Sequence, residues 1–462
     1  MSDVEAQPAL AERPWLERLF PFQVEGANAL IARKAVLLAD DMGLGKTIQA
    51  IAALRALKAT GQLQSAVVVV PAGLIAQWRL QFYEWAPELA FSTVRGPQTD
   101  RAWQWRTKAD VYIVSYETLR SDFSLNPHAP VAKEWSVVIL DEAQRIKNRD
   151  GDAAQVCKQL NRLRSWALTG TPLENGLDDT ASILEFVQSS PSGTRADSSA
   201  NDIRTALAEV QVRRRKADVL PQLPPKMSIT VPLDLLPAQR RAYDRAEREG
   251  IVVLRDLGAK ITITHVFELI LRLKQVCNFC PETGASAKLD DLRERLETIA
   301  AGGNKALVFS QFVDAPFGVS HLADKLSAFE PLQYHGGMDL YERDAAVTRF
   351  KRDPRHAALI LSLRAGGTGL NLQEASYVFH FDRWWNPATG RQAEDRSHRM
   401  GQKHPVTVYS YVCAGTIEER IEQILREKQQ LFDDVIDGGL GVDSAALSAA
   451  EVFGLFGLNA PA

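Results

Sequence analysis

The sequence of 462 residues has only four cysteines and no long apolar run, and both shortages limit the kind of protein that it can encode. Four scattered cysteines cannot form the disulfide framework on which small secreted domains depend. Apolar runs such as Ala66–Val70 are far shorter than the roughly 20 residues that span a bilayer, and the N-terminus lacks a basic segment followed by an apolar one. We therefore expect a cytoplasmic protein that is not inserted in a membrane.

Residues with metal-ligand spacing are also scarce. Among the cysteines, only Cys277 and Cys280 have the spacing of a ligand pair, whereas Cys157 and Cys413 lie far from them in the sequence. A zinc site needs two further ligands at comparable spacing, and none flank this pair. The simpler interpretation is two small side chains in a hydrophobic core.

Charge of one sign is not in large excess, because the formal net charge is −3. Nucleic-acid binding requires Lys and Arg to neutralise phosphates, so this balance at first argues against such a partner. The local distribution matters more. Two basic runs occur, at Arg213, Arg214, Arg215 and Lys216 and at Arg391, Arg396, Arg399 and Lys403. A charge run is usually only solvated surface, but these two are compatible with a basic groove.

With 45% hydrophobic and 24% charged residues, the chain has the composition of a globular protein, and its length predicts two or three domains. Short β-rich apolar runs alternate with helical patterns, which predicts parallel sheets covered by helices. The runs of the first half are residues 35–39, 66–70, 111–114, 137–140 and a stretch that ends at Leu168. Those of the second half are residues 306–309, 358–361, 377–381 and 406–412. We predict an α/β protein with two tandem lobes.

The region between the two series is predicted to be helical. Residues 235–277 carry few turn signals, and apolar side chains recur there at helical spacing, at Val266, Leu269, Ile270 and Leu273. Residues 189–201 are rich in Ser, Gly and Asp and predict a surface loop. The predicted domains are residues 1–226 for the first lobe, 227–288 for a helical linker or protrusion, 289–432 for the second lobe and 433–462 for a C-terminal tail.

The tail contains the pattern of a capping box. Ser448 is followed three residues later by Glu451, and apolar residues come next, at Val452, Leu455 and Phe456. This pattern predicts a short helix that docks through its apolar face.

A phosphate-binding loop is predicted after the first strand. Residues 40–47 open a helix with apolar residues at Ile48, Ile51, Leu54 and Leu57, which is the context that such a loop requires. Glycines let backbone N–H groups approach phosphate oxygens, and the helix N-terminus adds positive potential. Lys46 would neutralise the terminal phosphates of ATP, and Thr47 would ligate Mg²⁺. The predicted ATP-binding residues are Asp40, which replaces the first glycine of the generic pattern, Met42, Gly43, Leu44, Gly45, Lys46 and Thr47.

An acidic pair follows another predicted strand. Asp141 and Glu142 come directly after residues 137–140, and side chains at the carboxyl end of a parallel strand face the crevice. Asp141 would hold magnesium through its water shell, and Glu142 would orient and deprotonate the water that attacks the γ-phosphate. Such a pair is often only a favourable helix N-terminus. In combination with the phosphate loop, it predicts a nucleoside triphosphatase.

Residues 40–49 and 141–148 resemble motifs I and II of the Swi/Snf family, a group of superfamily 2 helicase-like DNA-dependent ATPases. The family tolerates aspartate at the first loop position. Residues 21–26 are similar to the family segment in which a glutamine reads the adenine edge, so the resemblance gives this role to Gln23. It implies two RecA-like lobes with parallel sheets and a helical protrusion or linker between them, and it implies ATP and Mg²⁺ as cofactors.

Further segments resemble family motifs in the expected order, at residues 71–78, 115–118, 168–175, 309–312, 334–337, 362–371, 381–387 and 392–402. Loops rich in Gly, Ser and Thr that follow strands suit contacts with phosphates, which read no base sequence. The resemblance implies double-stranded DNA as a partner and places Gly369 at the ATP site. The implied DNA contacts are Pro71, Gly73, Ser115, Tyr116, Gln311, His335, Gly336, Gly337, Thr368 and Trp385.

Arg396 and Arg399 are three residues apart, so both guanidinium groups are expected on one face of a helix, as two groups that reach one triphosphate must be. By family analogy they are arginine fingers, which complete a catalytic set with Lys46, Asp141 and Glu142. A finger from one lobe stabilises the transition state only when that lobe closes on ATP held by the other, which would tie hydrolysis to closure.

The sequence departs from the family pattern in two places. The segment 174–213 is shorter than the helical protrusion that family members usually have at this place. In addition, Phe279 follows Cys277-Asn278 where the family commonly has histidine. No chromatin-reading or zinc-finger sequence flanks the motor segments, so chromatin is not implied. A compact bacterial-type member is the better interpretation.

The sequence thus predicts an ATP-dependent translocase on double-stranded DNA that remodels or displaces DNA-bound proteins. Its expected location is the nucleoid, and its expected protein partners are DNA-bound proteins or partner subunits. One alternative is an RNA-directed helicase of the same superfamily, against which the family-like segment with Trp384 and Trp385 favours DNA. A second alternative is a nucleotide-gated DNA-binding subunit without turnover, against which the intact Lys46 and Glu142 argue. Duplex tracking without strand separation rests on the resemblance alone.

Overall fold

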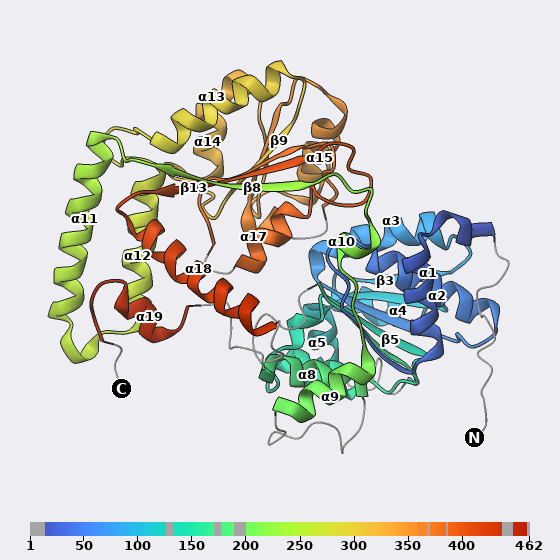
Figure 1. The fold of residues 1–462 in the computed structure, drawn as a ribbon. Coiled ribbons are helices and arrows are strands. Elements are labelled where there is room, and N and C mark those ends of the chain that lie inside the picture. The colour runs from blue at the N-terminus through green and yellow to red at the C-terminus, as the bar shows by residue number, and fades with distance from the viewer. Residues whose placement is uncertain are drawn as a thin grey trace. The chain divides into compact units, whose positions relative to one another are not determined.

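The computed structural model describes residues 14–125, 133–170, 177–188, 200–366, 370–384, 387–436 and 447–459. The chain divides into two compact units, Met1–Pro221 and Gln222–Ala462, and each is built on one parallel sheet (Figure 1). The predicted contacts Thr368 and Trp385, the predicted ATP-site residue Gly369 and most of the predicted loop 189–201 lie outside the described residues.

The first unit contains a seven-stranded sheet in the order β3-β4-β2-β5-β6-β1-β7, with every neighbouring pair parallel. Its strands are β1 Ala35–Leu38, β2 Ala66–Val70, β3 Phe91–Val94, β4 Val111–Ser115, β5 Val137–Asp141, β6 Ser165–Leu168 and β7 Gln211–Val212. The central strands are continuous runs of buried residues because helices cover both faces.

Alternate side chains of each strand enter one of two cores. In β2, Val68 packs on the side of α1, α2 and α3, whereas Val69 packs on the side of α5, α7, α8 and α9. The helices of this unit are α1 Pro21–Ala32, α2 Lys46–Ala59, α3 Ile75–Trp85, α4 Gln98–Arg106, α5 Tyr116–Leu125, α7 Asp152–Gln159, α8 Leu177–Gln188, α9 Ala200–Val210 and α10 Lys216–Val219. Short 3₁₀ turns occur at Pro14–Arg18, Ala72–Leu74 and Ala143–Ile146.

The second unit contains a six-stranded parallel sheet in the order β10-β11-β9-β12-β13-β8. Its strands are β8 Lys226–Leu233, β9 Ala306–Ser310, β10 Leu332–Tyr334, β11 Ala358–Ser362, β12 Tyr377–His380 and β13 Val406–Cys413. In β9, Val308 packs against α13 Ala287–Ala301 and α14 Val319–Lys325. The next residue, Phe309, packs on the opposite side with α15 Leu340–Arg352, α16 Leu363–Gly366 and α17 Pro387–Glu394.

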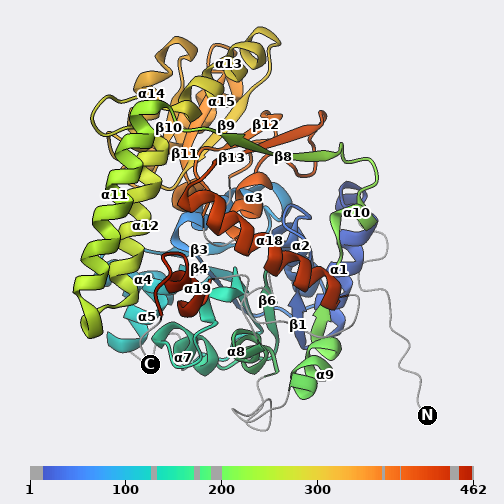
Figure 2. The same cartoon turned by 60° about the vertical axis from the view of Figure 1, so that its left-hand side comes forward.

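A helical core adjoins this sheet. It is formed by α11 Pro237–Asp256, α12 Ile263–Asn278, α18 Ile417–Ile436 and α19 Ala449–Gly454. Helices α11 and α12 run side by side in both views (Figure 2). At α19, the Ser448 hydroxyl accepts from the Glu451 N–H at 3.3 Å, the Glu451 carboxylate accepts from the Ser448 N–H at 2.6 Å, and Val452 is buried. The predicted C-terminal helix and its capping box are therefore confirmed.

All the strands predicted from apolar runs are present, but β3, β7, β8 and β10 were not predicted. The largest difference is β8, which pairs with β13 over its full length although residues 227–288 were predicted as a helical linker. β8 is an edge strand with Met227 50% and Ile229 43% exposed, so it lacks the buried run by which the other strands are recognised. Helices α11 and α12 do occupy the predicted helical region, and the four-part domain division stays a prediction.

Within the described ranges, no helix is long and apolar enough to cross a membrane.

Candidate nucleotide and nucleic-acid sites

The predicted ATP-site residues gather at the carboxyl edge of the first sheet. The phosphate loop follows β1, Asp141 ends β5 and Thr169 follows β6, and these three strands are consecutive in the sheet. The carboxyl ends of neighbouring parallel strands share one edge, which is where ligands of open α/β sheets bind. The fold therefore brings together segments that are well separated in the sequence, because a βαβ crossover returns each strand to the same edge.

The phosphate loop has the backbone that its glycines permit. Gly43 and Gly45 have φ values of 84° and 75°, in the left-handed region that favours glycine. Lys46 donates from Nζ to the carbonyl oxygens of Asp40 at 2.7 Å and Asp41 at 3.3 Å, so its ammonium group lies within the loop. A Cβ atom at Gly170 would lie 2.5 Å from the Met42 side chain and 3.5 Å from Lys46 Nζ. Glycine at this position therefore lets the segment after β6 approach the loop.

Asp40, which departs from the generic pattern, is completely buried and paired with Arg214. The Arg214 guanidinium donates to Asp40 Oδ2 at 2.6 Å and to Oδ1 at 3.0 Å. Gln49 donates to Asp40 Oδ2 at 3.0 Å and accepts from Arg214 at 2.8 Å. Because a buried charge requires a partner, Arg214 is what allows an aspartate to begin this loop. The sequence indicated Arg214 only as one residue of a basic run.

The backbone around Arg214 also runs along the phosphate loop. The N–H of Ala39 donates to the carbonyl of Val212 at 2.7 Å, and the N–H of Asp41 donates to the carbonyl of Arg214 at 3.0 Å. The Asp41 carboxylate accepts from the N–H of Lys216 at 2.9 Å. The segment that leads from β7 into α10 is therefore hydrogen-bonded to the loop along its length.

The Asp141 carboxylate is buried and held at both oxygens. Oδ2 accepts from the Trp78 indole N–H at 2.6 Å, and Oδ1 accepts from the Glu142 N–H at 3.0 Å. Burial and the charge of Glu142 raise the pKa of Asp141 to about 7, against the lowering effects of the Trp78 hydrogen bond and the Lys46 charge. A buried carboxylate whose charge is not fully neutralised by its neighbours fits the binding of a cation such as Mg²⁺. Thr47, the other predicted ligand, lies at the start of α2, and its contact with Mg²⁺ stays a prediction.

Glu142 has an unusual backbone conformation. Its φ of 50° and ψ of 55° place a non-glycine residue in the left-handed region, where strain often accompanies function. Its Oε2 accepts from Gln144 Nε2 at 2.7 Å, and Gln144 Oε1 accepts from the Thr169 hydroxyl at 2.9 Å. The carboxylate is thus oriented by a chain of hydrogen bonds that reaches the end of β6.

Gln23 lies against the phosphate loop. Its side chain is buried, with Nε2 donating to the carbonyl of Leu44 at 3.2 Å and Oε1 accepting from the Phe20 N–H at 3.1 Å. The contact with Leu44 brings Gln23 to the loop, as a residue of the ATP site requires. Its role in reading adenine stays a prediction.

The four predicted DNA contacts of the first unit differ in accessibility. Gly73 is exposed, whereas Pro71, Ser115 and Tyr116 are buried. The Ser115 hydroxyl accepts from the Thr118 N–H at 3.1 Å, and the Tyr116 hydroxyl donates to the carbonyl of Asp141 at 2.9 Å. The side chains of Ser115 and Tyr116 therefore take part in hydrogen bonds inside the unit, and their contacts with DNA stay predictions.

In the second unit, Gln311 follows β9, and His335, Gly336 and Gly337 follow β10, all at the carboxyl edge of the sheet. Both glycines are exposed, and Gly337 donates from its N–H to His335 Nδ1 at 3.3 Å. The Gln311 N–H donates to the buried carboxylate of Asp382 at 2.7 Å, which fixes the start of that loop. Contacts of these residues with DNA stay predictions.

Arg396 and Arg399 do not share a helix, so the expectation of a common helical face is wrong. Helix α17 ends at Glu394, and the two arginines follow in turns. The carbonyl of Arg396 accepts from the N–H of Leu372 at 2.9 Å, a contact that draws the chain away from the helical path. Burial and the positive charge of Arg396 lower the pKa of Arg399 to about 10. Their role as fingers stays a prediction.

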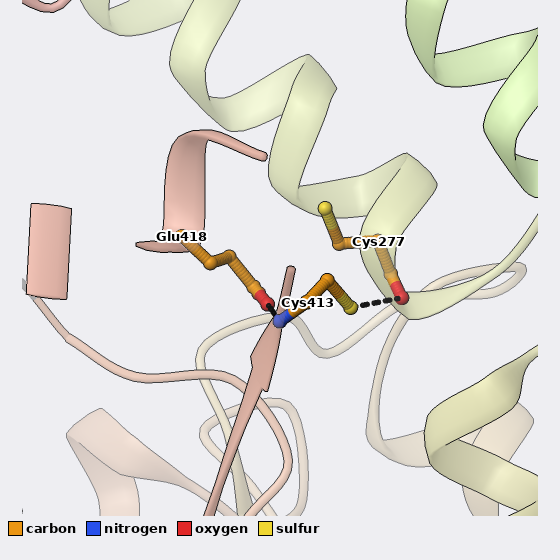
Figure 3. A group of neighbouring side chains, drawn as sticks. All are labelled: Cys277, Cys413 and Glu418. Atoms are coloured by element: carbon orange, nitrogen blue, oxygen red, sulfur yellow. Dashed lines mark hydrogen bonds between the residues drawn. The ribbon is translucent and has the colours of Figure 1, made fainter. Parts of the chain in front are cut away.

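The cysteines form part of a core rather than a ligand pair. Ligand atoms of Cys277, Cys413 and Glu418 lie within 4.8 Å of one another (Figure 3). Cys280 is not a member of this group. Both oxygens of Glu418 are engaged, Oε1 with the Lys288 ammonium at 2.6 Å and Oε2 with the Cys413 N–H at 3.0 Å. The charge of Glu418 raises the pKa of Lys288 above its ordinary value although burial alone would lower it. A buried ammonium group already neutralises the carboxylate, so the cluster does not fit a metal ion.

A phosphate loop and an acidic pair on one parallel sheet, followed by a second parallel sheet, are the parts of a two-lobed P-loop nucleoside triphosphatase. The family model described as the SNF2-related domain matches residues 22–281, and the helicase conserved C-terminal domain matches residues 287–401. The first match covers more than half of the chain. The chain therefore belongs to the SNF2-related family, as the motifs predicted.

The similar proteins include bacterial and eukaryotic ones. The chain is 32% identical, over 96% of its length and 51% of the relative, to YwqA of Bacillus subtilis, which is named as a candidate ATP-dependent helicase/translocase. It is 31% identical, over 93% of its length and 44% of the relative, to the mouse SWI/SNF-related matrix-associated actin-dependent regulator of chromatin subfamily A member 1. The Sulfolobus solfataricus SWI2/SNF2 ATPase core in complex with dsDNA is 29% identical, with a TM-score of 0.43 over 96% of this chain and 97% of that one. The chain spans about half the length of the curated relatives.

Proposed function

We propose that this chain hydrolyses ATP to move along double-stranded DNA and thereby remodels or displaces DNA-bound proteins. The observation that carries the proposal is the arrangement of Lys46, Asp141 and Glu142 at one edge of the first sheet, in a chain of the SNF2-related family. Relatives named as ATP-dependent helicases support the use of ATP.

The residues of the first unit have separable tasks in hydrolysis. Lys46 and the N–H groups of the loop bind the phosphates, and Gln23 borders the same loop. Glu142 orients the attacking water and takes its proton, from a position that Gln144 and Thr169 hold. Thr47 and Asp141 would hold magnesium, which when bound supplies positive charge to the phosphate oxygens.

Arg396 and Arg399 complete the site in this proposal. Guanidinium groups stabilise the charge that develops on a phosphoryl group in the transition state. Their location in the second unit, with ATP held by the first, would make hydrolysis depend on the approach of the two units. Alternating approach and release would then advance the chain along the DNA.

DNA is proposed to contact the carboxyl edges of both sheets. Gly73 in the first unit and Gly336 in the second are exposed there and would offer backbone N–H groups, and Gly337 is exposed beside Gly336 although its N–H donates to His335 Nδ1. Such contacts with phosphates are independent of base sequence, as a translocating protein requires. Binding should therefore weaken steeply with salt and little with sequence.

The direct test compares ATP hydrolysis by the chain alone, with duplex DNA and with RNA. We expect duplex DNA to raise kcat about tenfold or more and RNA to have little effect. A response to RNA alone would assign the chain to the RNA-directed helicases. Glu142→Gln should remove turnover while ATP binding persists, and equal rates for this variant and the wild type would indicate a binding subunit without turnover.

Translocation is tested separately by displacement of a triplex-forming strand from duplex DNA. We expect displacement with ATP and none with Lys46→Ala. ATP hydrolysis without displacement would contradict processive tracking while leaving the ATPase assignment in place.

A further inference from the structure

We propose that Trp78 is a positioning residue, whose indole N–H holds the Asp141 carboxylate in the orientation required for metal binding and ATP hydrolysis. The inference rests on the proposed function, because it gives Asp141 a task at the ATP site. It adds a residue to that site from a helix that carries none of the residues of the phosphate loop or the acidic pair.

The contact is short and directional. Trp78 lies on α3 with 1% of its surface exposed, and its Nε1 is 2.6 Å from Asp141 Oδ2. Hydrogen bonds to an ionised acceptor are shorter and stronger than neutral ones. Because Oδ1 accepts from the Glu142 N–H at 3.0 Å, the two donors together fix the rotation of the carboxylate about its bond to the chain. Phe82 packs beside the indole, with ring centroids 5.9 Å apart, and limits movement of the donor.

A purely structural role would explain a buried tryptophan but not where its N–H points. Trp166 on β6 provides the comparison, because it belongs to the same core and is completely buried. Among the described residues, its Nε1 has no hydrogen-bond partner. This core therefore accommodates a tryptophan whose indole N–H is unused, whereas Trp78 directs its N–H to a carboxylate that lies 63 residues away in the sequence.

Asp141 lies at the end of β5, between two groups of strands that carry different predicted sites. β5 lies between β6 and β1, which carry the nucleotide segments, and β2 and β4, which precede the predicted DNA contacts. Helix α3 begins directly after the turn Ala72–Leu74 that follows β2, and Tyr116, after β4, donates to the Asp141 carbonyl. Asp141 is thus hydrogen-bonded to the elements that follow β2 and β4, and of these two bonds the one from Trp78 reaches its carboxylate.

The test uses the full chain with Trp78→Phe and the matched variant Trp166→Phe. Both lose an indole from the same core, but only the first loses a donor to Asp141. We measure kcat and KM for ATP with saturating duplex DNA, the Mg²⁺ concentration for half-maximal rate, and the melting temperature. For Trp78→Phe we expect kcat to fall about tenfold or more and the Mg²⁺ midpoint to rise about tenfold, which are typical losses when a residue that orients a metal ligand is removed. For Trp166→Phe we expect both within about twofold of the wild type.

Equal kcat values and equal Mg²⁺ midpoints for the two variants would overturn the proposal if the wild type hydrolyses ATP. An inactive wild type would instead overturn the proposed function. Where Trp78→Phe melts below the assay temperature, both variants are assayed below its melting temperature. Trp78→His retains an N–H donor, so its Mg²⁺ midpoint should be closer to the wild-type value than that of Trp78→Phe, and equal midpoints for Trp78→His and Trp78→Phe would contradict the positioning role.

Discussion

Arg214 and Asp40 neutralise each other at the start of the phosphate loop, with 13% of the arginine side chain and none of the aspartate exposed. Removing one member of such a pair leaves the other charge buried without compensation. We expect Arg214→Ala to lower the free energy of unfolding of the first unit by about 3 kcal/mol and to weaken ATP binding. Urea denaturation and titration with a fluorescent ATP analogue measure the two effects.

Arg213 provides the control for this prediction, because it is the exposed neighbour in the same basic run. Arg213→Ala should change the free energy of unfolding by no more than about 0.5 kcal/mol. The double variant Asp40→Ala with Arg214→Ala should be less destabilised than the sum of the two single variants. Additive effects would show that the pair contributes little.

The variant Arg399→Ala tests whether the second unit takes part in ATP hydrolysis. If Arg399 contacts phosphate only in the transition state, Arg399→Ala should reduce kcat by about 10³-fold or more while the affinity for ATP changes little. Single-turnover hydrolysis and equilibrium binding separate the two quantities. Unchanged turnover would remove Arg399 from the catalytic set.

Residues that act through a local pattern were predictable, and those that act through a distant partner were not. Lys46, Thr47, Asp141 and Glu142 follow strands whose apolar runs mark the edge of a sheet, so their neighbours in sequence reveal their place. The partners of Trp78 and Arg214 are 63 and 174 residues away, and no local signal connects them.

Glu394 of helix α17 connects this helix to strands β12 and β8 of the second unit. Its carboxylate accepts from His380 of β12 at 3.2 Å and from Lys226 of β8 at 2.6 Å. Burial alone would raise the pKa of Glu394, but the hydrogen bond from His380 and the charges of His380 and Lys226 outweigh it and lower the pKa to about 2.

This lowered pKa predicts a pH dependence of stability. The ordinary value is 4.5, so the ionised carboxylate contributes stability that is complete above pH 4.5 and is lost as the pH falls toward about 2. In this window the wild type should take up as many as about one more proton on unfolding than Glu394→Gln does. The free energy of unfolding of the variant should therefore depend less on pH. Urea denaturation between the two pH values measures the slope, and the exposed Glu297→Gln, which should match the wild type, is the control.

Helices α19 and α17 show which features of a helix the sequence predicts and which it does not. The capping box at Ser448 lies within four consecutive residues, and α19 begins there as predicted. The geometry of Arg396 and Arg399 was missed because α17 ends in contacts with the loop around Leu372, which no helical periodicity encodes.

Each of the two units has its own hydrophobic cores, and the phosphate loop belongs to the first unit alone. Calorimetry should therefore resolve two unfolding transitions. ATP analogue with Mg²⁺ at about 100 times its Kd should raise one of them by roughly 5–10 °C and leave the other in place. Lys46→Ala should abolish the shift. Equal shifts of both transitions would contradict a site formed by the first unit in the absence of DNA.

The segment that contains edge strand β7 and helix α10 also links the first unit to the second. Its backbone is bonded to the phosphate loop at Ala39 and Asp41, only a few residues before the chain reaches Gln222. Tension along this connection should therefore act on the loop that is predicted to bind ATP. For the proposed motor, an opposing load would be felt at the nucleotide pocket itself, and the ATP concentration for half-maximal velocity should vary with the load in a single-molecule measurement.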